Sequence, residues 1–461
     1  MKIIKNGTLI SPEKIRKADI AIQHNKIIEI SESISPNDGD EVYDASGCYV
    51  FPGFIDGHTH FDMDTGTAHT ADDFVSGTKA AVVGGTTTIV DFATQEKGQT
   101  LKEAYDIWMK KAKDKSSCNY RFHMAITDWN DNVKEELSKM PELGVTSFKM
   151  YMAYNNLISN DAEILACLKK IKEIDGVLGV HCENGALINE LTKEKIAADE
   201  TAPSAHPASR PDYVEAEAIN RLGYISTLAN HPVNIVHLSS LAGLNEIRNV
   251  RKRNQTITVE TCPQYLFLDD HYYNLDNFEG AKYVISPPLR KAEDNKALIQ
   301  AIVDGEIDTI ATDHCSFNFK RDKELGKEDF RKIPNGAPGV EHRPQLIYTY
   351  LVEEGRIDIM KMCELMAANP AKRYGMYPDK GTLEVGSDAD IVIFSPDYEG
   401  VITWRKQIQN VDYTPYEGFK VKGQAKDVFV NGECVVKDGV IVKENQGTYV
   451  FGPKGKCKEN F

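Results

Sequence analysis

The central part of the sequence alternates between short apolar, β-branched runs and stretches with helical periodicity, and this alternation restricts the fold more than any other feature. Eight runs have the character of strands: 49–56, 86–93, 120–126, 145–153, 177–183, 233–239, 256–262 and 308–315. The clearest helical stretches are 71–83, 101–113, 161–174, 213–229, 241–253 and 292–303. Alternating strands and helices form parallel sheets with right-handed crossovers. Eight such units predict an α/β fold of the (β/α)8 TIM barrel type.

The two ends of the chain differ from its centre. Residues 1–50 are strand-like and contain turns at Asn6-Gly7 and His24-Asn25. The strand-like pattern returns near the other end, at 389–394, 427–431 and 434–442. Neither end is suited to form a full domain alone. We therefore predict that residues 1–50 and 381–461 together build a small β-sandwich domain, with an extended tail after residue 446, and that residues 51–380 form the barrel.

Composition and charge exclude several classes of function. The chain has 461 residues and a net charge of −15, which argues against a nucleic-acid or anionic-membrane partner. No apolar run approaches the length of about 18 residues needed for a membrane span, and the first residues lack the apolar core of a signal peptide. The nine cysteines include no CxxC pair and are interpreted as reduced thiols. We expect a cytoplasmic protein.

Polar residues that can bind metal stand where several predicted strands end, which is where barrel active sites are built. They are His58, His60, Lys149, His181, His237 and Asp313. His58 and His60 are two residues apart on a strand, so both imidazoles can face the same ion. Each histidine taken alone could equally be a buried residue satisfied by its neighbours, and Asp313 could cap a loop. Their coincidence at one predicted mouth favours a metal site.

Lys149 is the unusual member of this set, because it lies on an apolar strand that should face the core. A buried ammonium group is costly, and nearby cations would repel it. Reaction with carbon dioxide would convert the amine to a carbamate anion that can bridge two metals. Pairing of Lys149 with a carboxylate is the alternative.

A set of longer motifs resembles the dihydropyrimidinase/D-hydantoinase family of the amidohydrolase superfamily. The matching segments follow the family order almost from end to end: 53–63, 72–74, 84–88, 147–154, 181–184, 237–240, 286–290, 312–315, 335–339 and 381–390. They include Asp56-Gly57-His58-Thr59-His60 and Thr312-Asp313-His314-Cys315. The set as a whole is far more specific than any single motif.

The resemblance implies a binuclear site, usually of zinc. His58, His60 and Asp313 would hold one metal ion. His181 and His237 would hold the other, and carboxylated Lys149 would bridge the two. In this family a hydroxide shared by the metals attacks the carbonyl of a cyclic amide.

The resemblance also assigns roles around the metals. Asp313 would take the proton of the hydroxide and deliver it to the leaving nitrogen, and Tyr154 would donate to the developing oxyanion. The backbone groups of Ser286 and Asn335 would bind the imide edge of the ring. A homotetramer is expected.

The side-chain pocket for the ring substituent is predicted from the loops after His60 and after Lys149. Met63, Tyr151 and Ile158 are its candidate residues. The long insert 316–343 is rich in Lys, Asp and Glu, and we expect most of it to be a solvated surface loop, with Asn335-Gly336 as the exception.

Several alternatives remain at this point. Dihydroorotase often has an Arg shortly after the first HxH motif, whereas Asp62 and Asp64 stand here and disfavour an anionic ring. An allantoinase-like ureide hydrolase is closer, because allantoin is itself a substituted hydantoin. Some dihydropyrimidinase-like proteins have lost the ligands and act as inactive scaffolds, but all six ligand positions are filled here. The sequence therefore favours a hydrolase that opens hydantoin or dihydropyrimidine rings to N-carbamoyl amino acids.

Overall fold

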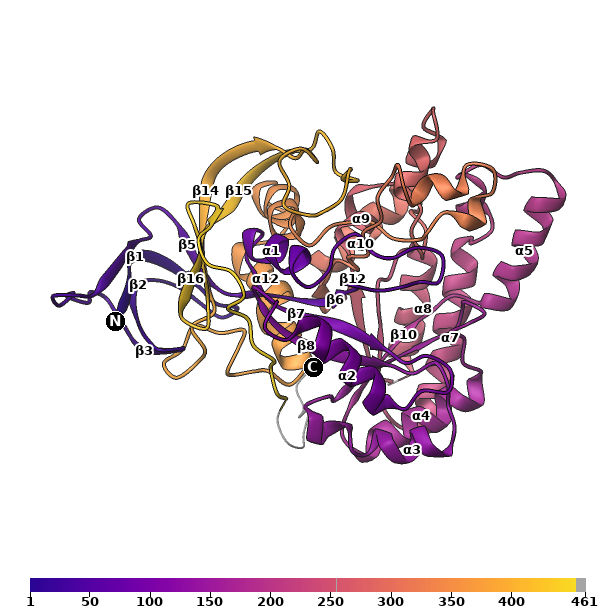
Figure 1. Cartoon of the computed structure of the whole chain (residues 1–461), viewed down its shortest axis with the longest axis horizontal. Helices are drawn as coiled ribbons and strands as arrows, with labels where there is room; N and C mark the ends of the chain where they lie inside the picture. The colour runs from indigo at the N-terminus through magenta and orange to yellow at the C-terminus, as the bar shows by residue number, and fades with distance from the viewer. Residues whose placement is uncertain (254, 453–461) are drawn as a thin grey trace.

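The computed structural model describes residues 1–253 and 255–452, and its larger part is a parallel eight-stranded barrel (Figure 1). Its strands, which neighbour one another in chain order, are β6 (Phe54–Thr59), β7 (Thr86–Thr94), β8 (Asn119–Ala125), β9 (Ser147–Tyr151), β10 (Val177–His181), β11 (Val233–Ile235), β12 (Ile257–Thr261) and β13 (Thr309–Ile310). β6 meets the segment that follows β13 through a parallel bridge between Thr59 and His314. The predicted barrel is confirmed.

The helices pack around the barrel strands, and short capping motifs fix where several of them begin. Thr100 and Asn160 form capping boxes at the starts of α2 and α4. The α-helices are α1 (Ser76–Val83), α2 (Leu101–Ala112), α3 (Asp131–Leu137), α4 (Asp161–Glu173), α5 (Gly185–Ala197), α6 (Ala205–Ala208), α7 (Asp212–Ala229), α8 (Leu241–Lys252), α9 (Pro263–Phe267), α10 (Ala292–Val303), α11 (Arg343–Ile347), α12 (Ile359–Cys363) and α13 (Asn369–Arg373). The 3-10 and π turns are η1 (Met140–Leu143), η2 (Asp270–Asn274), η3 (Glu279–Tyr283), η4 (Lys323–Gly326), η5 (Phe330–Lys332), η6 (Tyr348–Glu353) and η7 (Glu364–Ala368).

Both ends of the chain contribute to a second, mixed sheet beside the barrel, as predicted. Its strands are β1 (Lys2–Ile10), β2 (Ile15–Gln23), β3 (Lys26–Ser31), β4 (Glu41–Asp44), β5 (Tyr49–Pro52), β14 (Ile391–Val401), β15 (Lys420–Val430), β16 (Glu433–Lys437) and β17 (Val440–Ile441). N-terminal β5 pairs with C-terminal β14, so the indigo and yellow strands lie together in Figure 1. The hydrogen bonds join the strands into one continuous sheet, which has an apolar core of its own that includes Ile20, Val50 and Phe429.

The run 49–56, which the sequence presents as one strand, is divided in the structure. Gly53 separates β5, in the outer sheet, from β6, in the barrel. A Cβ atom at Gly53 would lie 1.9 Å from Oγ1 of Thr87, so only glycine lets the chain pass this close to β7. The apolar character continues through both strands, which is why the boundary is not evident in the sequence.

The insert 316–343 differs from the predicted solvated loop. Lys323 and Phe330 are buried, although Arg321 and Lys327 are exposed as expected. A Cβ atom at Gly326 would lie 2.1 Å from Ile333, which shows how closely the insert folds on itself. The insert is therefore a compact element with a buried interior.

The described part of the C-terminal segment is extended, as predicted, and runs along the barrel. Tyr120 donates its backbone N–H to Thr448, and Val450 donates to Tyr120, at 3.1 and 2.9 Å. The remainder of the predicted tail, 453–461, lies outside the described residues.

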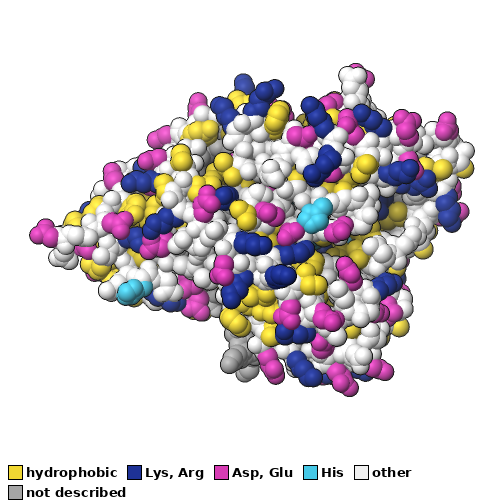
Figure 2. Space-filling view, in the orientation of Figure 1, with side chains coloured by type: hydrophobic (Ala, Val, Ile, Leu, Met, Phe, Trp, Pro, Cys, Tyr) yellow, Lys and Arg dark blue, Asp and Glu magenta, His cyan; other side chains and the backbone are white. Residues whose placement is uncertain are grey.

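Within the described part of the chain, no helix combines the length and the apolar character that a membrane span requires. On the face drawn in Figure 2, Lys and Arg side chains are interspersed with Asp and Glu. This distribution agrees with the overall acidic charge of −15 and gives no single basic face in that view.

Candidate metal centre

The barrel brings six of the predicted residues to the carboxyl ends of its strands. His58 lies at the end of β6 and His60 directly after it, Lys149 lies in β9, and His181 is the last residue of β10. His237 lies two residues after the end of β11 and Asp313 three residues after the end of β13, and both have a positive φ, 42° and 53°. Such strained backbone at non-glycine residues is concentrated in functional sites.

Asp313 joins the first group of candidate ligands. Its Oδ1 lies 3.1 Å from Nε2 of His58 and 3.2 Å from Nε2 of His60. One ligand atom of each of these three residues lies within 4.8 Å of the others. Imidazole nitrogens and a carboxylate oxygen at this spacing are the donor set of a catalytic zinc site.

The charges of this group are strongly coupled. Burial works against a charged carboxyl, but the nearby His58 imidazole outweighs it and holds the pKa of Asp313 well below its ordinary value. Burial also opposes the charged form of His58, yet Asp313 raises the pKa of His58 to about 8. For His60, burial is decisive and lowers the pKa to about 4.

His181 and His237 form the second group. Nδ1 of His181 lies 3.0 Å from Nε2 of His237, and both side chains are buried. Burial lowers the pKa of both imidazoles, so both are neutral at pH 7. Two neutral imidazoles that direct ring nitrogens at one another provide two lone pairs for a shared cation.

Lys149 lies among these groups, with 1% of its surface exposed. Its Nζ is 4.9 Å from the ring centroid of Phe92 and 5.3 Å from that of Tyr151. Among the described residues no carboxylate lies within ion-pair distance of Lys149. Burial lowers its pKa to about 8, against the opposing charges of Asp313 and Glu260. The amine is therefore more easily deprotonated than an ordinary lysine.

Two glutamates that the sequence analysis missed orient the histidines. Glu260 accepts a hydrogen bond from Nδ1 of His58 at 2.7 Å and one from the backbone N–H of His237 at 3.2 Å. Glu183 bonds to Nε2 of His181 at 2.8 Å. Carboxylates in this position fix the ring orientation of metal-binding histidines. The spacing of two residues that joined His58 to His60 also joins His181 to Glu183, and it could have identified the latter.

The predicted substrate-binding residues fall into two sets. The Tyr154 ring lies 5.0 Å from the His181 ring, and Tyr151 lies 6.2 Å from it, so both border the histidines. Asn335 donates from Nδ2 to Oγ of Ser286 at 3.0 Å, which joins the two loops. Burial raises the pKa of the Tyr154 phenol, and a hydrogen bond with the Ser286 side chain partly opposes this rise. Met63 stands apart: its backbone N–H donates to the Thr70 hydroxyl, and its carbonyl accepts from the Thr70 N–H.

Several polar atoms of this region are buried without a hydrogen-bond partner among the described residues. They include Nδ1 of His60, Nδ1 of His237 and Oε2 of Glu260. Buried polar atoms are normally satisfied, so unsatisfied ones need an explanation such as a bound ion. The nitrogen and carboxylate donors, the neutral imidazoles and these atoms together fit divalent metal.

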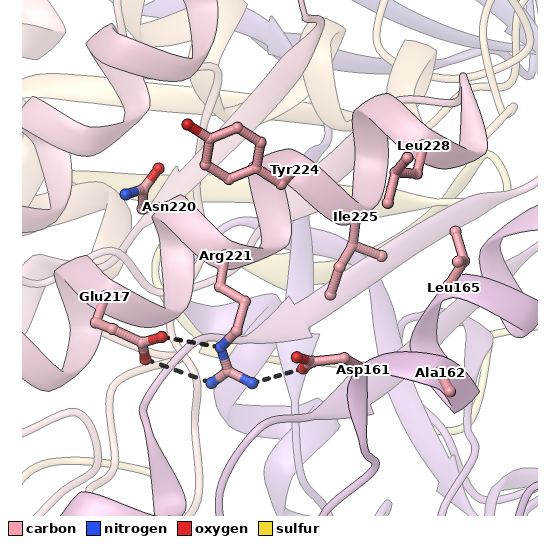
Figure 3. A pocket seen from close by; sticks show the side chains of 9 residues that line it. All are labelled: Asp161, Ala162, Leu165, Glu217, Asn220, Arg221, Tyr224, Ile225 and Leu228. Atoms are coloured by element: carbon pink, nitrogen blue, oxygen red, sulfur yellow. Dashed lines mark hydrogen bonds and ion pairs between the residues drawn. The ribbon is translucent and has the colours of Figure 1, made fainter.

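A surface groove of about 520 Å³ lies elsewhere, between α4 and α7 (Figure 3). Arg221 on α7 pairs there with Asp161 and Glu217, and Tyr224 and Leu228 line the groove. None of the candidate metal ligands lines this groove. It is thus separate from the barrel mouth.

Comparison with known proteins agrees with this architecture. The model of the Amidohydrolase family matches residues 49–435. A D-hydantoinase of Geobacillus stearothermophilus is 44% identical over 452 residues, which cover 97% of this chain and 96% of the relative. A D-phenylhydantoinase of Escherichia coli strain SE11 is 41% identical over 451 residues, or 97% of each chain. The crystal structure of dihydropyrimidinase from Brevibacillus agri NCHU1002 aligns with a TM-score of 0.97 and 40% identity over 99% of each chain.

A parallel barrel with imidazole, lysine and carboxylate groups at its mouth, together with the family match, defines a hydrolase of the amidohydrolase class. Within that class, the chain belongs to the D-hydantoinase/dihydropyrimidinase family. The family predicted from the sequence motifs is confirmed.

Proposed function

We propose that this chain is a metal-dependent cyclic amide hydrolase that opens hydantoin or dihydropyrimidine rings to N-carbamoyl amino acids. The observation that carries the proposal is the gathering of four histidines, Lys149 and Asp313 around the mouth of the barrel. Relatives named D-hydantoinase, D-phenylhydantoinase and dihydropyrimidinase, which align over nearly the whole chain, support the same class of substrate.

Two divalent cations, most simply zinc, would occupy the site. His58, His60 and Asp313 would hold one, and His181 and His237 the other. The carbamate of Lys149, formed from its amine and carbon dioxide, would join the two sites. The lowered pKa of the buried lysine supports this, because carbon dioxide reacts with the neutral amine. When bound, such a metal pair makes water nucleophilic near neutral pH and polarises the amide carbonyl.

The protein's own residues would move the proton and stabilise charge. Asp313 takes the proton of the attacking water and delivers it to the ring nitrogen, which leaves as the C–N bond breaks. The buried Tyr154 phenol, which stays protonated because its pKa is raised, donates a hydrogen bond to the oxyanion that develops on the carbonyl. The Arg210 guanidinium, 5.3 Å from the Tyr154 ring centroid, helps to hold the phenol in place.

The ring itself would be bound through the backbone of Ser286 and Asn335. Among the described residues, the backbone N–H and C=O groups of these two residues have no hydrogen-bond partner. Ser286 is buried and Asn335 half-buried, so free backbone groups there are available to a ligand. The free N–H and C=O groups of these two residues can pair with the alternating C=O and N–H groups along the imide edge of the ring. Met63, Tyr151 and Ile158 would contact the ring substituent.

We also propose that the protein is a homotetramer, as expected from the family resemblance. Its binding partner would be the small cyclic substrate. Light scattering of the purified protein tests the tetramer directly. The acidic net charge supports the absence of a nucleic-acid or membrane partner.

Ring opening by the purified, zinc- and bicarbonate-supplied protein tests the proposed function. The panel is dihydrouracil, hydantoin, a 5-aryl hydantoin, allantoin and dihydroorotate, each with a chelated control. We expect chelator-sensitive turnover of hydantoin or dihydrouracil. Turnover of allantoin or dihydroorotate alone would move the chain to those activities, and no turnover by protein carrying two metals would contradict the proposed substrates. A folded Lys149→Ala variant with full metal content and full activity would contradict the carbamate.

A further inference from the structure

Lys323 is fully buried inside the insert that the sequence presents as a solvated loop. Its Nζ donates to three backbone carbonyls: Val284 at 2.9 Å, Pro334 at 2.7 Å and Gly336 at 2.7 Å. An ammonium group has three N–H donors, so all three are used. Among the described residues no carboxylate forms an ion pair with it. Burying an unpaired lysine is costly, which makes a purely incidental placement a poor explanation.

The three carbonyls flank the two residues proposed to bind the ring. Pro334 and Gly336 stand on either side of Asn335, and Val284 lies two residues before Ser286. One ammonium group therefore connects two loops that lie about fifty residues apart in sequence. The N–H of Gly336 also donates to Val284, at 3.1 Å, so Lys323 braces a contact that already exists between the loops.

Other side chains occupy the remaining carbonyls next to Ser286. Nε2 of His206 bonds to the carbonyl of Ile285 at 2.8 Å, and the Tyr265 hydroxyl donates to that of Pro287 at 2.8 Å. The neighbouring carbonyls are thus all bound, while those of Ser286 and Asn335 remain free among the described residues. The arrangement leaves the ligand a restricted set of backbone groups at a fixed spacing.

We propose that Lys323 is a positioning residue that sets the spacing between the Ser286 and Asn335 backbone groups and so controls how tightly the imide edge of the ring is held. This inference rests on the proposed function for its substrate. Lys323 touches neither the reacting atoms nor the candidate metal ligands among its described contacts, so it should act on binding more than on the chemical step.

The kinetic test compares Lys323→Met with Lys327→Met, an exposed lysine four residues further along the insert that pairs with Glu324 at the surface. On the ring that the wild type turns over best, we expect Lys323→Met to raise KM by about 10-fold while kcat changes by less than about 3-fold. Lys323→Gln, which keeps an N–H donor group, should recover part of the loss. Lys327→Met should match the wild type.

Amide hydrogen exchange supplies a readout that does not depend on turnover. In Lys323→Met, peptides that contain Gly336 should exchange faster, whereas peptides from α4 and from the outer sheet should be unchanged. If Lys323→Met does not fold, the same comparison is made with Lys323→Gln. If the wild-type protein turned over no ring, the proposed function would be refuted. The exchange data would still test whether Lys323 fixes the spacing of the two loops.

Two outcomes would overturn the inference. One is a wild-type KM together with unchanged exchange around Gly336. The other is faster exchange throughout the barrel with kcat and metal content lowered and KM unchanged, which would make Lys323 a general stabilising residue.

Discussion

Asp313 contacts both imidazoles of the first ligand group, at 3.1 and 3.2 Å, and is also the proposed proton carrier. Replacing it with Ala should therefore lower turnover by about 10³-fold or more, because a metal ligand and a general acid–base are lost together. Ring opening and metal content are measured on the same sample. The exposed Asp304→Asn variant serves as the control. Turnover within tenfold of the wild type would remove Asp313 from the mechanism.

Tyr154 has a positive φ of 68°, so Phe at this position has the same backbone cost and removes only the hydroxyl. If the phenol stabilises the oxyanion, Tyr154→Phe should lower kcat by about 10²–10³-fold with metal content unchanged. Tyr213→Phe, on a side chain that is 75% exposed, gives the baseline. An unaltered kcat would leave the ring of Tyr154 with a packing role alone.

Replacing Glu260 tests whether its carboxylate orients the metal-binding imidazoles. Glu260→Gln keeps an oxygen that can accept from His58 but removes the negative charge, so metal affinity should fall by about 10-fold or more. Competition with a chromophoric chelator measures this affinity without reference to turnover. Equal affinity in the variant would show that the charge of Glu260 is not needed to hold the imidazole.

At this scale, the strand-end pattern indicated which residues would come together, because residues at the carboxyl ends of parallel strands share one mouth. Glu260 was missed because a buried glutamate inside a strand carries no spacing signal of its own, whereas Glu183 stands two residues after His181, a spacing that could have identified it. Their role depends on which imidazole nitrogen faces inward, and that is decided by three-dimensional packing.

At the scale of the element, Gly53 separates the outer sheet from the barrel. A methyl group there would lie 1.9 Å from the Thr87 hydroxyl oxygen, so Gly53→Ala should lower the free energy of unfolding by about 1–3 kcal/mol. Denaturant unfolding measures the change. Gly339→Ala is the matched control, because a Cβ there would lie 3.7 Å from Cβ of Thr312, which is an ordinary van der Waals contact. Equal destabilisation by both variants would show that crowding at Thr87 is not the cause.

The eight barrel strands were predictable because each is a short apolar run followed by a helical pattern. Two features of the elements were not. The division at Gly53 lies inside one apolar run, and the buried interior of the insert 316–343 is hidden by its many charged residues. Lys323 illustrates the second case, because its burial depends on carbonyls supplied by distant segments.

At the scale of the whole molecule, the candidate ligands come from strands spread around the barrel, from β6 to the segment that follows β13. Bound metal should therefore stabilise the complete fold by mass action, and chelation should lower the melting temperature. Thermal unfolding before and after chelation, followed by zinc addition, measures this effect. Recovery with zinc is expected, and Mg²⁺, which prefers oxygen ligands, should restore less. A melting temperature indifferent to chelation in metal-loaded protein would contradict a site that spans the barrel.

The joining of both chain ends beside the barrel was evident because each end repeats a strand-like pattern without enough length for a domain. The sequence pattern predicted a β-sandwich, whereas the hydrogen bonds join the strands into one continuous sheet. The tetramer and the preference for a ring substituent are different, since surface contacts and pocket shape depend on side-chain detail that the motifs do not encode.

The most direct test of a binuclear metal centre is stepwise reconstitution of chelated protein with zinc in bicarbonate. Metal content and the turnover of hydantoin or dihydrouracil are measured on every sample. We expect turnover to be absent without metal and to reach its maximum at two zinc ions per chain, and we expect Lys149→Ala to stay below that maximum. Full turnover by metal-free protein, or by protein with a single zinc ion, would contradict a binuclear centre.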